Sequence, residues 1–306
     1  MNISGKLQGW HYALLCYLTW GTFPIYWYPI NQSGMPAEQI LAQRVLWSAL
    51  FAVFLLLIFQ QGRAVINAFK QPKVLGLFVL SSFMIGVNWL VYLWAIVNEH
   101  ILDASLGYFI NPIFNVFVGR LILKEQLNKA QLLALLFAIS GILWLAIPAG
   151  QIPWVALILA ASFCIYGLIR KLAPMEPLSG LALETLLMSP FAITYLCFCY
   201  HQNILVFSEL NPLQMAVLLC SGIATTLPLL WFAMGARRIS MSLLGMLQYI
   251  SPTLQFLCGV LIFNETLSAE RAVGYILVWI GVGVFLLGMK KLVSNAKNKT
   301  LNISFW

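Results

Sequence analysis

The chain contains ten long apolar segments within 306 residues, and this pattern limits the folds available to it. Each segment has about 18–24 residues, which at a rise of 1.5 Å per residue crosses a bilayer core of roughly 30 Å. The segments lack the alternation of membrane β-strands, and an open sheet cannot satisfy its backbone in lipid. We therefore predict membrane-spanning helices. The segments cover residues 8–29, 37–60, 74–97, 102–123, 130–148, 152–170, 178–200, 212–235, 241–263 and 271–289.

The overall composition excludes the main alternatives to a membrane protein. Hydrophobic residues make up 61% of the chain and charged residues 8%, whereas soluble domains are nearer half apolar and a quarter charged. A soluble fold of this size cannot bury so many apolar side chains, and a disordered chain would contain far fewer. The short connections between segments also leave no room for a separate soluble domain.

Basic residues concentrate in alternate connections between the segments. If the N-terminus is cytoplasmic, all but two of the 17 Lys and Arg residues fall on the cytoplasmic side, as the positive-inside rule describes. The exceptions are Arg44, within the second segment, and Arg271, at the outer start of the last one. This placement explains the net charge of +8 without nucleic acid as a partner. We expect a multi-pass protein whose N- and C-termini are both cytoplasmic.

The sequence resembles itself when it is shifted by 140 residues. Coincident residues that are rare or costly in membrane helices are Pro112 with Pro252, Gly141 with Gly281, and Glu125 with Glu265. Because each copy holds five segments, an odd number, the second copy enters the membrane from the opposite side. We predict an all-α integral membrane protein with ten transmembrane helices in two inverted five-helix repeats, residues 1–150 and 151–306, the second ending in a short cytoplasmic tail. Each repeat-matched glutamate is expected to cap the helix that follows it.

Two prolines and a set of polar and aromatic residues predict where a substrate binds. Pro112 and Pro252 lie near the middle of their segments, where a missing N–H and a steric clash predict a break in each helix. Aromatic walls with a few amides suit a mid-sized organic molecule better than a bare ion. The alternative is that the amides only hold helices together. The candidate binding residues are Trp20, Asn88, Trp89, Tyr92, Tyr108, Asn111, Thr226, Gln248, Tyr249 and Ser251.

Two ionisable residues, Arg44 and Glu184, lie well inside segments and occupy corresponding positions of the repeat. Charges at such depth are costly, so both are candidate binding residues. They differ in depth by roughly 13 Å, and we therefore expect each to line one half of a pathway rather than to pair. The alternative is that each side chain reaches towards its nearer membrane surface. Glu184 is also a candidate carrier of a coupling proton.

The run from Ala104 to Pro112, ASLGYFINP, resembles the signature of the RarD family of permeases. Further blocks agree, including Arg170-Lys171, and the resemblance spans roughly residues 8–290. It implies ten helices, two EamA-type halves, a bacterial inner membrane and a permease role. Family members are described as chloramphenicol-sensitivity or resistance permeases. The family's usual His-Arg pair in the second helix is Gln43-Arg44 here, so only the arginine matches.

These features favour a secondary transporter that moves a small organic or drug-like solute by alternating access. The expected partners are that solute, membrane lipid and a coupling proton. No Walker A pattern is present, and we expect no cofactor, no metal and no nucleic acid. A lipid flippase and an integral-membrane enzyme are the alternatives. The chain offers little for catalysis, because its three histidines are scattered and Asp103 is its only aspartate.

Overall fold

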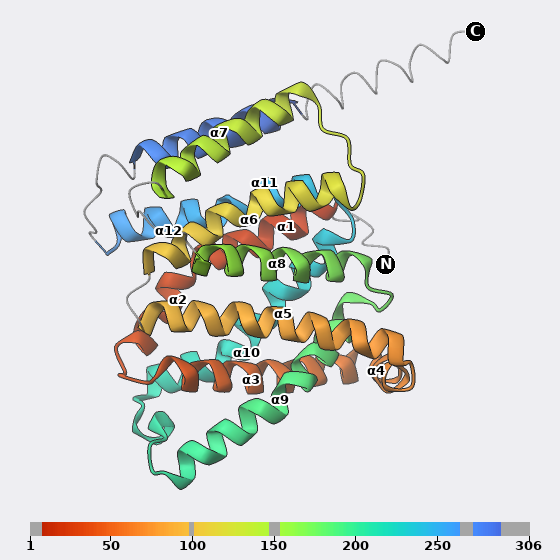
Figure 1. The fold of residues 1–306 in the computed structure, drawn as a ribbon. Coiled ribbons are helices and arrows are strands. Elements are labelled where there is room, and N and C mark those ends of the chain that lie inside the picture. The colour runs from red at the N-terminus through yellow and green to blue at the C-terminus, as the bar shows by residue number, and fades with distance from the viewer. Residues whose placement is uncertain (1–7, 98–100, 147–153, 264–271, 289–306) are drawn as a thin grey trace, which may run out of the picture.

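The computed structural model describes residues 8–97, 101–146, 154–263 and 272–288. These residues form α-helices and one 3-10 turn, with no strand among them, and most helices run roughly parallel in Figure 1. The elements are α1 (Gly9–Gly21), α2 (Phe23–Asn31), α3 (Ala37–Ile58), α4 (Gly62–Phe69), α5 (Pro72–Val97), α6 (Ile101–Leu121), α7 (Lys129–Ala146), α8 (Trp154–Leu172), α9 (Pro177–His201), η2 (Val206–Glu209), α10 (Pro212–Ala236), α11 (Met241–Gln248) and α12 (Ile250–Leu261). A further apolar helix covers Ala272–Gly288.

Within the described chain, six helical stretches are long and apolar enough to cross a membrane. They are α3, α8, α9, α10, the Pro72–Tyr92 part of α5 and the Met241–Leu261 stretch of α11 and α12. Large apolar side chains on their outer faces are exposed, among them Leu57, Phe191 and Leu261. Apolar surface of this extent on long apolar helices is typical of a protein that contacts lipid. The chain is therefore an all-helical membrane protein, as its composition predicts.

Two of the predicted segments are interrupted helices. The first segment divides into α1 and α2 at Thr22, and Pro24 lies in the first turn of α2. The ninth divides at Tyr249, so that Pro252 lies in the first turn of α12. Proline is tolerated there because the first N–H groups of a helix have no intrahelical partner.

The break expected at Pro112 is absent. Helix α6 continues through this residue from Ile101 to Leu121. A single proline removes one backbone hydrogen bond, and packing on both sides can hold the remaining turns. The backbone of Gly245 provides such packing, since a Cβ at that position would lie 2.8 Å from the carbonyl oxygen of Pro112.

Helix α4 was not expected, because its eight residues lie within a connection between two predicted segments. Val65 and Ala68 are buried, and the helix packs on α5 and α9. Ile66 and Phe69 are exposed on its other side. Tertiary packing of one short apolar face is enough to form such a helix.

The helix pairs repeat between the two halves of the chain. Helix α1 packs on α10 and α12, and its repeat counterpart α8 packs on α5 and α6. Helix α3 likewise packs on α10, as α9 does on α5. Helices α3 and α9 contact each other, as do α6 and α11. Every one of these contacts has a counterpart under the 140-residue shift.

The same relationship holds at atomic detail between α7 and the Ala272–Gly288 helix. A Cβ on Gly141 would lie 2.8 Å from the carbonyl oxygen of Gly274, and one on Gly281 would lie 2.8 Å from that of Ala134. Ala134 and Gly274 are also matched by the shift. The two helices therefore approach each other through reciprocal contacts of equivalent residues.

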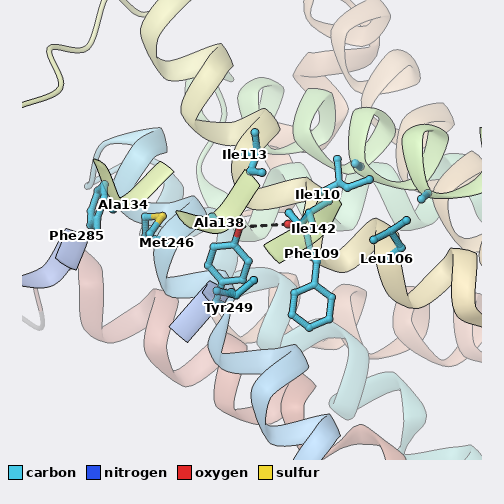
Figure 2. Close-up of a cluster of buried hydrophobic side chains, with 13 residues drawn as sticks. Leu106, Phe109, Ile110, Ile113, Ala134, Ala138, Ile142, Met246, Tyr249 and Phe285 are labelled. Carbon is cyan, nitrogen blue, oxygen red and sulfur yellow. Dashed lines mark hydrogen bonds between the residues drawn. The ribbon is translucent and has the colours of Figure 1, made fainter. Parts of the chain in front are cut away.

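The two largest buried clusters each join residues of both halves. Figure 2 shows the first, which joins α6, α7, α11 and the last helix, and in which the Tyr249 hydroxyl donates to the Phe109 carbonyl oxygen at 3.2 Å. The second is aromatic and contains Tyr17, Trp20 and Phe232. These clusters hold the elements that carry the polar residues described next.

Candidate functional site

Arg44, on α3, lies among aromatic side chains from two neighbouring helices. Its guanidinium carbon is 4.4 Å from the centroid of the Trp89 ring on α5 and 5.9 Å from that of Trp27 on α2. Its Nε donates a hydrogen bond of 2.8 Å to the Thr225 hydroxyl on α10. These contacts hold the guanidinium in one orientation, stacked on an aromatic face.

Two tyrosines, Tyr92 and Tyr108, also lie beside Arg44. The Tyr92 and Tyr108 rings have centroids 5.8 Å apart at an interplanar angle of 65°, and both interact electrostatically with Arg44. Arg44, Trp89 and both tyrosines are partly exposed. We call Trp27, Arg44, Trp89, Tyr92, Tyr108 and Thr225 the Arg44 site.

The local sequence explains how α5 contributes to this site. Trp89 and Tyr92 are three residues apart, so both point to one face of the helix. Asn88 is four residues from Tyr92 but is buried against α8, where its Nδ2 donates to the Leu159 carbonyl oxygen at 2.9 Å. The aromatic residues are thus left on the side that faces Arg44.

Glu184 occupies a separate buried cluster. Its carboxylate pairs with Arg170 of α8 at 3.4 Å, accepts from the Ser81 hydroxyl of α5 at 2.5 Å, and accepts from the Tyr166 hydroxyl at 3.4 Å. Arg170 also donates to the Pro177 carbonyl oxygen at 2.7 Å. Arg44 and Glu184 therefore have different partners, and among the described residues they do not pair with each other.

Arg170 is a buried residue that sequence reasoning missed. We assigned it to a cytoplasmic connection, yet only 2% of its surface is exposed. Its position four residues after Tyr166, on one helical face, was the available signal. That spacing alone does not show that a carboxylate from α9 would approach both residues.

The amide side chains of Asn111, Asn115 and Gln248 form one hydrogen-bonded group. Asn115 Nδ2 donates to Asn111 Oδ1 at 3.0 Å and to Gln248 Oε1 at 3.1 Å, which links α6 to α11. Asn111 Nδ2 donates to the Ala160 carbonyl oxygen at 3.0 Å. All three amides are buried. This arrangement is the helix-joining alternative that the sequence left open, and direct substrate binding by these amides stays a prediction.

Other predicted residues bond to backbone carbonyl groups or pack in the core. The Ser251 hydroxyl donates to the Tyr17 carbonyl oxygen at 2.8 Å, and the Thr226 hydroxyl donates to the Ser48 carbonyl oxygen at 3.5 Å. Trp20 is partly exposed and meets Phe163 edge to face at a centroid distance of 5.6 Å. The structure thus brings Arg44, Trp89, Tyr92 and Tyr108 together and places the remaining candidates at helix contacts around them.

Glu125 caps a different helix from the one expected. Its two carboxylate oxygens accept from the backbone N–H groups of Met241 and Ser242 at 2.6 and 3.0 Å, at the start of α11. The following helix, α7, is capped by Asn128 and Gln131 instead. A helix start attracts any nearby carboxylate, and the fold brings α11 closer. Glu265 lies outside the described residues.

The part of the chain that the structure describes holds no group of three or more His, Cys, Asp or Glu residues suited to a metal ion. The chemistry of the Arg44 site is that of a cation held beside aromatic faces. Such a site can bind and orient a solute, and it offers no nucleophile paired with a base.

Comparisons with known proteins agree with this description. Residues 7–147 and 152–287 each match the EamA-like transporter family. "Protein RarD" of Salmonella typhi is 40% identical over 288 residues, which cover 94% of this chain and 97% of that protein. The "Uncharacterized transporter YojE" of Bacillus subtilis is 38% identical over 295 residues, covering 95% and 97%. A crystal structure with 18% identity has a TM-score of 0.67 over 91% of this chain and 97% of its own, a likeness of fold alone.

Proposed function

Because this chain belongs to the EamA-like transporter family, we propose that it is a secondary transporter of a small organic solute in a bacterial inner membrane. The observation that carries the proposal is the Arg44 site, where a partly exposed cation lies among aromatic rings from several packed helices. Its residues come from α2, α3, α5 and α6 of one half and α10 of the other. A solute bound there would contact both halves.

The proposed architecture is ten crossings in two inverted halves, residues 1–150 and 151–306. The reciprocal contacts at Gly141 and Gly281 support it, because equivalent residues meet equivalent partners. Two similar halves of opposite orientation can exchange conformations, which opens a shared site to either side in turn.

We place both termini in the cytoplasm. The connections α3–α5, α6–α7, α8–α9 and α10–α11 lie at one end of the bundle in Figure 1. Ten of the 17 Lys and Arg residues lie in these connections or in the adjoining turns of the helices. Direct contacts join two of them, since Lys171 Nζ donates to the Ala236 carbonyl oxygen at 2.9 Å and Arg237 donates to that of Met175 at 2.7 Å. A basic end is the cytoplasmic end in most membrane proteins.

Proton coupling is assigned to Glu184. It is the only carboxyl group that is fully buried among the described residues. Protonation would neutralise it and release Arg170, which ties α8 to α9, so a proton there would change helix contacts. Transport by Glu184→Gln across pH tests this role. Flux should lose its pH dependence, whereas an unchanged pH profile would remove Glu184 from coupling. Glu209→Gln, at an exposed position, is the control.

Solute counterflow in proteoliposomes tests the proposal as a whole. Amino acids, amphenicols and amines are suitable first solutes, and a ligand that binds should also raise the melting temperature of the purified protein. Counterflow supports a transporter. Scrambling of labelled lipid without solute flux would favour a flippase, and chemical conversion of an added substrate would favour an enzyme.

A further inference from the structure

We propose that the Arg44 site binds the carboxylate of an organic monoanion whose apolar or aromatic body lies against Trp27, Trp89, Tyr92 and Tyr108. The inference rests on the proposed transport function and specifies the class of solute. Three features of the site support it: the free edge of the guanidinium, the charge balance around it, and the kind of surface beside it.

The contacts of Arg44 leave one edge of the guanidinium available. Nε is used by Thr225, and one face of the group lies over Trp89. No described residue accepts a hydrogen bond from Nη1 or Nη2. These two nitrogens present parallel N–H donors, and a carboxylate has two oxygens at the matching spacing.

The charge balance favours an anion. The ion pair formed among the described residues joins Arg170 and Glu184, and the Glu125 carboxylate is used at the start of α11. None of the described acidic side chains pairs with Arg44. An incoming anion would pair with Arg44 and offset the cost of holding this cation within the membrane.

The same balance limits the charge of the ligand. Arg44 is the only cationic side chain in the Arg44 site as defined above, so one negative charge is compensated there and a second is not. A carboxylate meets this limit, whereas a dianionic phosphate ester would bring an unpaired charge into the bundle. A cationic amine would be repelled.

The surface beside Arg44 suits an apolar or aromatic body. The Trp27 and Trp89 rings both lie within 6 Å of the Arg44 guanidinium carbon, at 5.9 and 4.4 Å, and the Tyr92 and Tyr108 rings meet at 65°. All four rings are partly exposed. Aromatic faces and edges of this kind pack well against another ring.

The test measures binding to the purified full chain by calorimetry and by thermal shift. The probes are phenylacetate, 3-phenylpropionate and indole-3-acetate, each compared with its uncharged primary amide, and 3-phenylpropylamine. We expect at least one carboxylate to bind, its amide to bind on the order of 10- to 100-fold more weakly, and the amine not to bind. If none of the three acids binds better than its own amide, the inference is wrong.

Variants assign the effect to this residue. Arg44→Gln should remove the preference for the acid over the amide, and Arg44→Lys should retain part of it, since Lys keeps the charge but not the planar edge. Arg63→Gln removes an equal charge from an exposed position on α4 and should leave the preference for the acid over the amide intact. A preference that survives Arg44→Gln would overturn the assignment. The acid–amide comparison on the unmodified protein stands even if that variant does not fold.

Flux measurements separate this inference from the transport proposal. Carboxylate binding that depends on Arg44 without any solute counterflow would support the binding site and remove the transport function. Counterflow of a neutral or cationic solute that Arg44→Gln leaves unchanged would support transport and overturn the carboxylate site. Counterflow of the acid, lost in Arg44→Gln and retained in Arg63→Gln, would support both.

Discussion

Arg170 Nη1 lies 3.4 Å from Glu184 Oε1, and both side chains are buried where α8, α9 and α5 meet. The absence of a side chain at Gly180 makes this possible, because a Cβ there would collide with Arg170 Nη1. Arg170 Nε has no hydrogen-bond partner among the described residues. The pair is therefore sensitive to loss of either charge, since no other charged side chain among the described residues pairs with the one that remains, which keeps only hydrogen bonds.

Removing one member of this pair should be more harmful than removing both. Arg170→Gln or Glu184→Gln alone leaves a buried, uncompensated charge, and each should destabilise the protein by about 3–5 kcal/mol. The double variant Arg170→Met with Glu184→Leu should be much closer to the unmodified protein. Melting temperatures in detergent provide the comparison. If the double variant loses as much as the two single variants together, the charges do not act as a pair.

The approach of α7 to the last helix predicts opposite results for two nearby glycines. Gly281→Ala places a methyl group 2.8 Å from the Ala134 carbonyl oxygen and should lower the melting temperature. Gly283→Ala meets no atom within 4 Å and should be neutral or slightly stabilising, because Ala favours helix. Gly141→Ala should behave like Gly281→Ala, as the repeat requires. Equal tolerance of all three substitutions would contradict the reciprocal packing.

The cap that Glu125 provides to α11 predicts a loss of stability on its removal. Its carboxylate accepts from Met241 N, Ser242 N and the Ser242 hydroxyl. Glu125→Ala should cost about 1–2 kcal/mol, as loss of a helix cap does. Glu209→Ala, at an exposed position, is the control and should cost little. Denaturation of the purified variants measures both, and a harmless Glu125→Ala would show that the cap is dispensable.

The inverted arrangement predicts the sides from which two connections can be labelled. Arg63 and Gln202 lie in corresponding connections of the two halves and are both exposed. Cysteines placed at these positions should differ in their reaction with an impermeant maleimide. Gln202→Cys should react in intact cells, and Arg63→Cys should react only after the membrane is opened. The native exposed thiols, Cys197 and Cys220, should first be replaced. Labelling of both sites from the same face would exclude the odd number of crossings per half.

Several features were predictable because they depend on local sequence alone. The free energy of transferring a segment into lipid is a sum over its own residues, so the apolar runs predicted the helices within about three residues. The match to RarD proteins was also visible in a short motif, and the comparisons confirm it. The different depths of Arg44 and Glu184 along their helices argued against an ion pair between them. In the structure, Arg44 bonds to Thr225 and Glu184 pairs with Arg170.

Only the tertiary structure decided which polar groups meet. Arg170 looked like one more cytoplasmic charge until α9 brought Glu184 beside it, and Glu125 caps α11 because that helix start is closer than the start of α7. Pro112 and Pro252 are matched in sequence, yet only the helix that contains Pro252 is interrupted, at Tyr249. The physical reason is that lipid burial depends on a segment by itself, whereas a hydrogen bond, an ion pair or a helix break depends on the neighbours that pack against it.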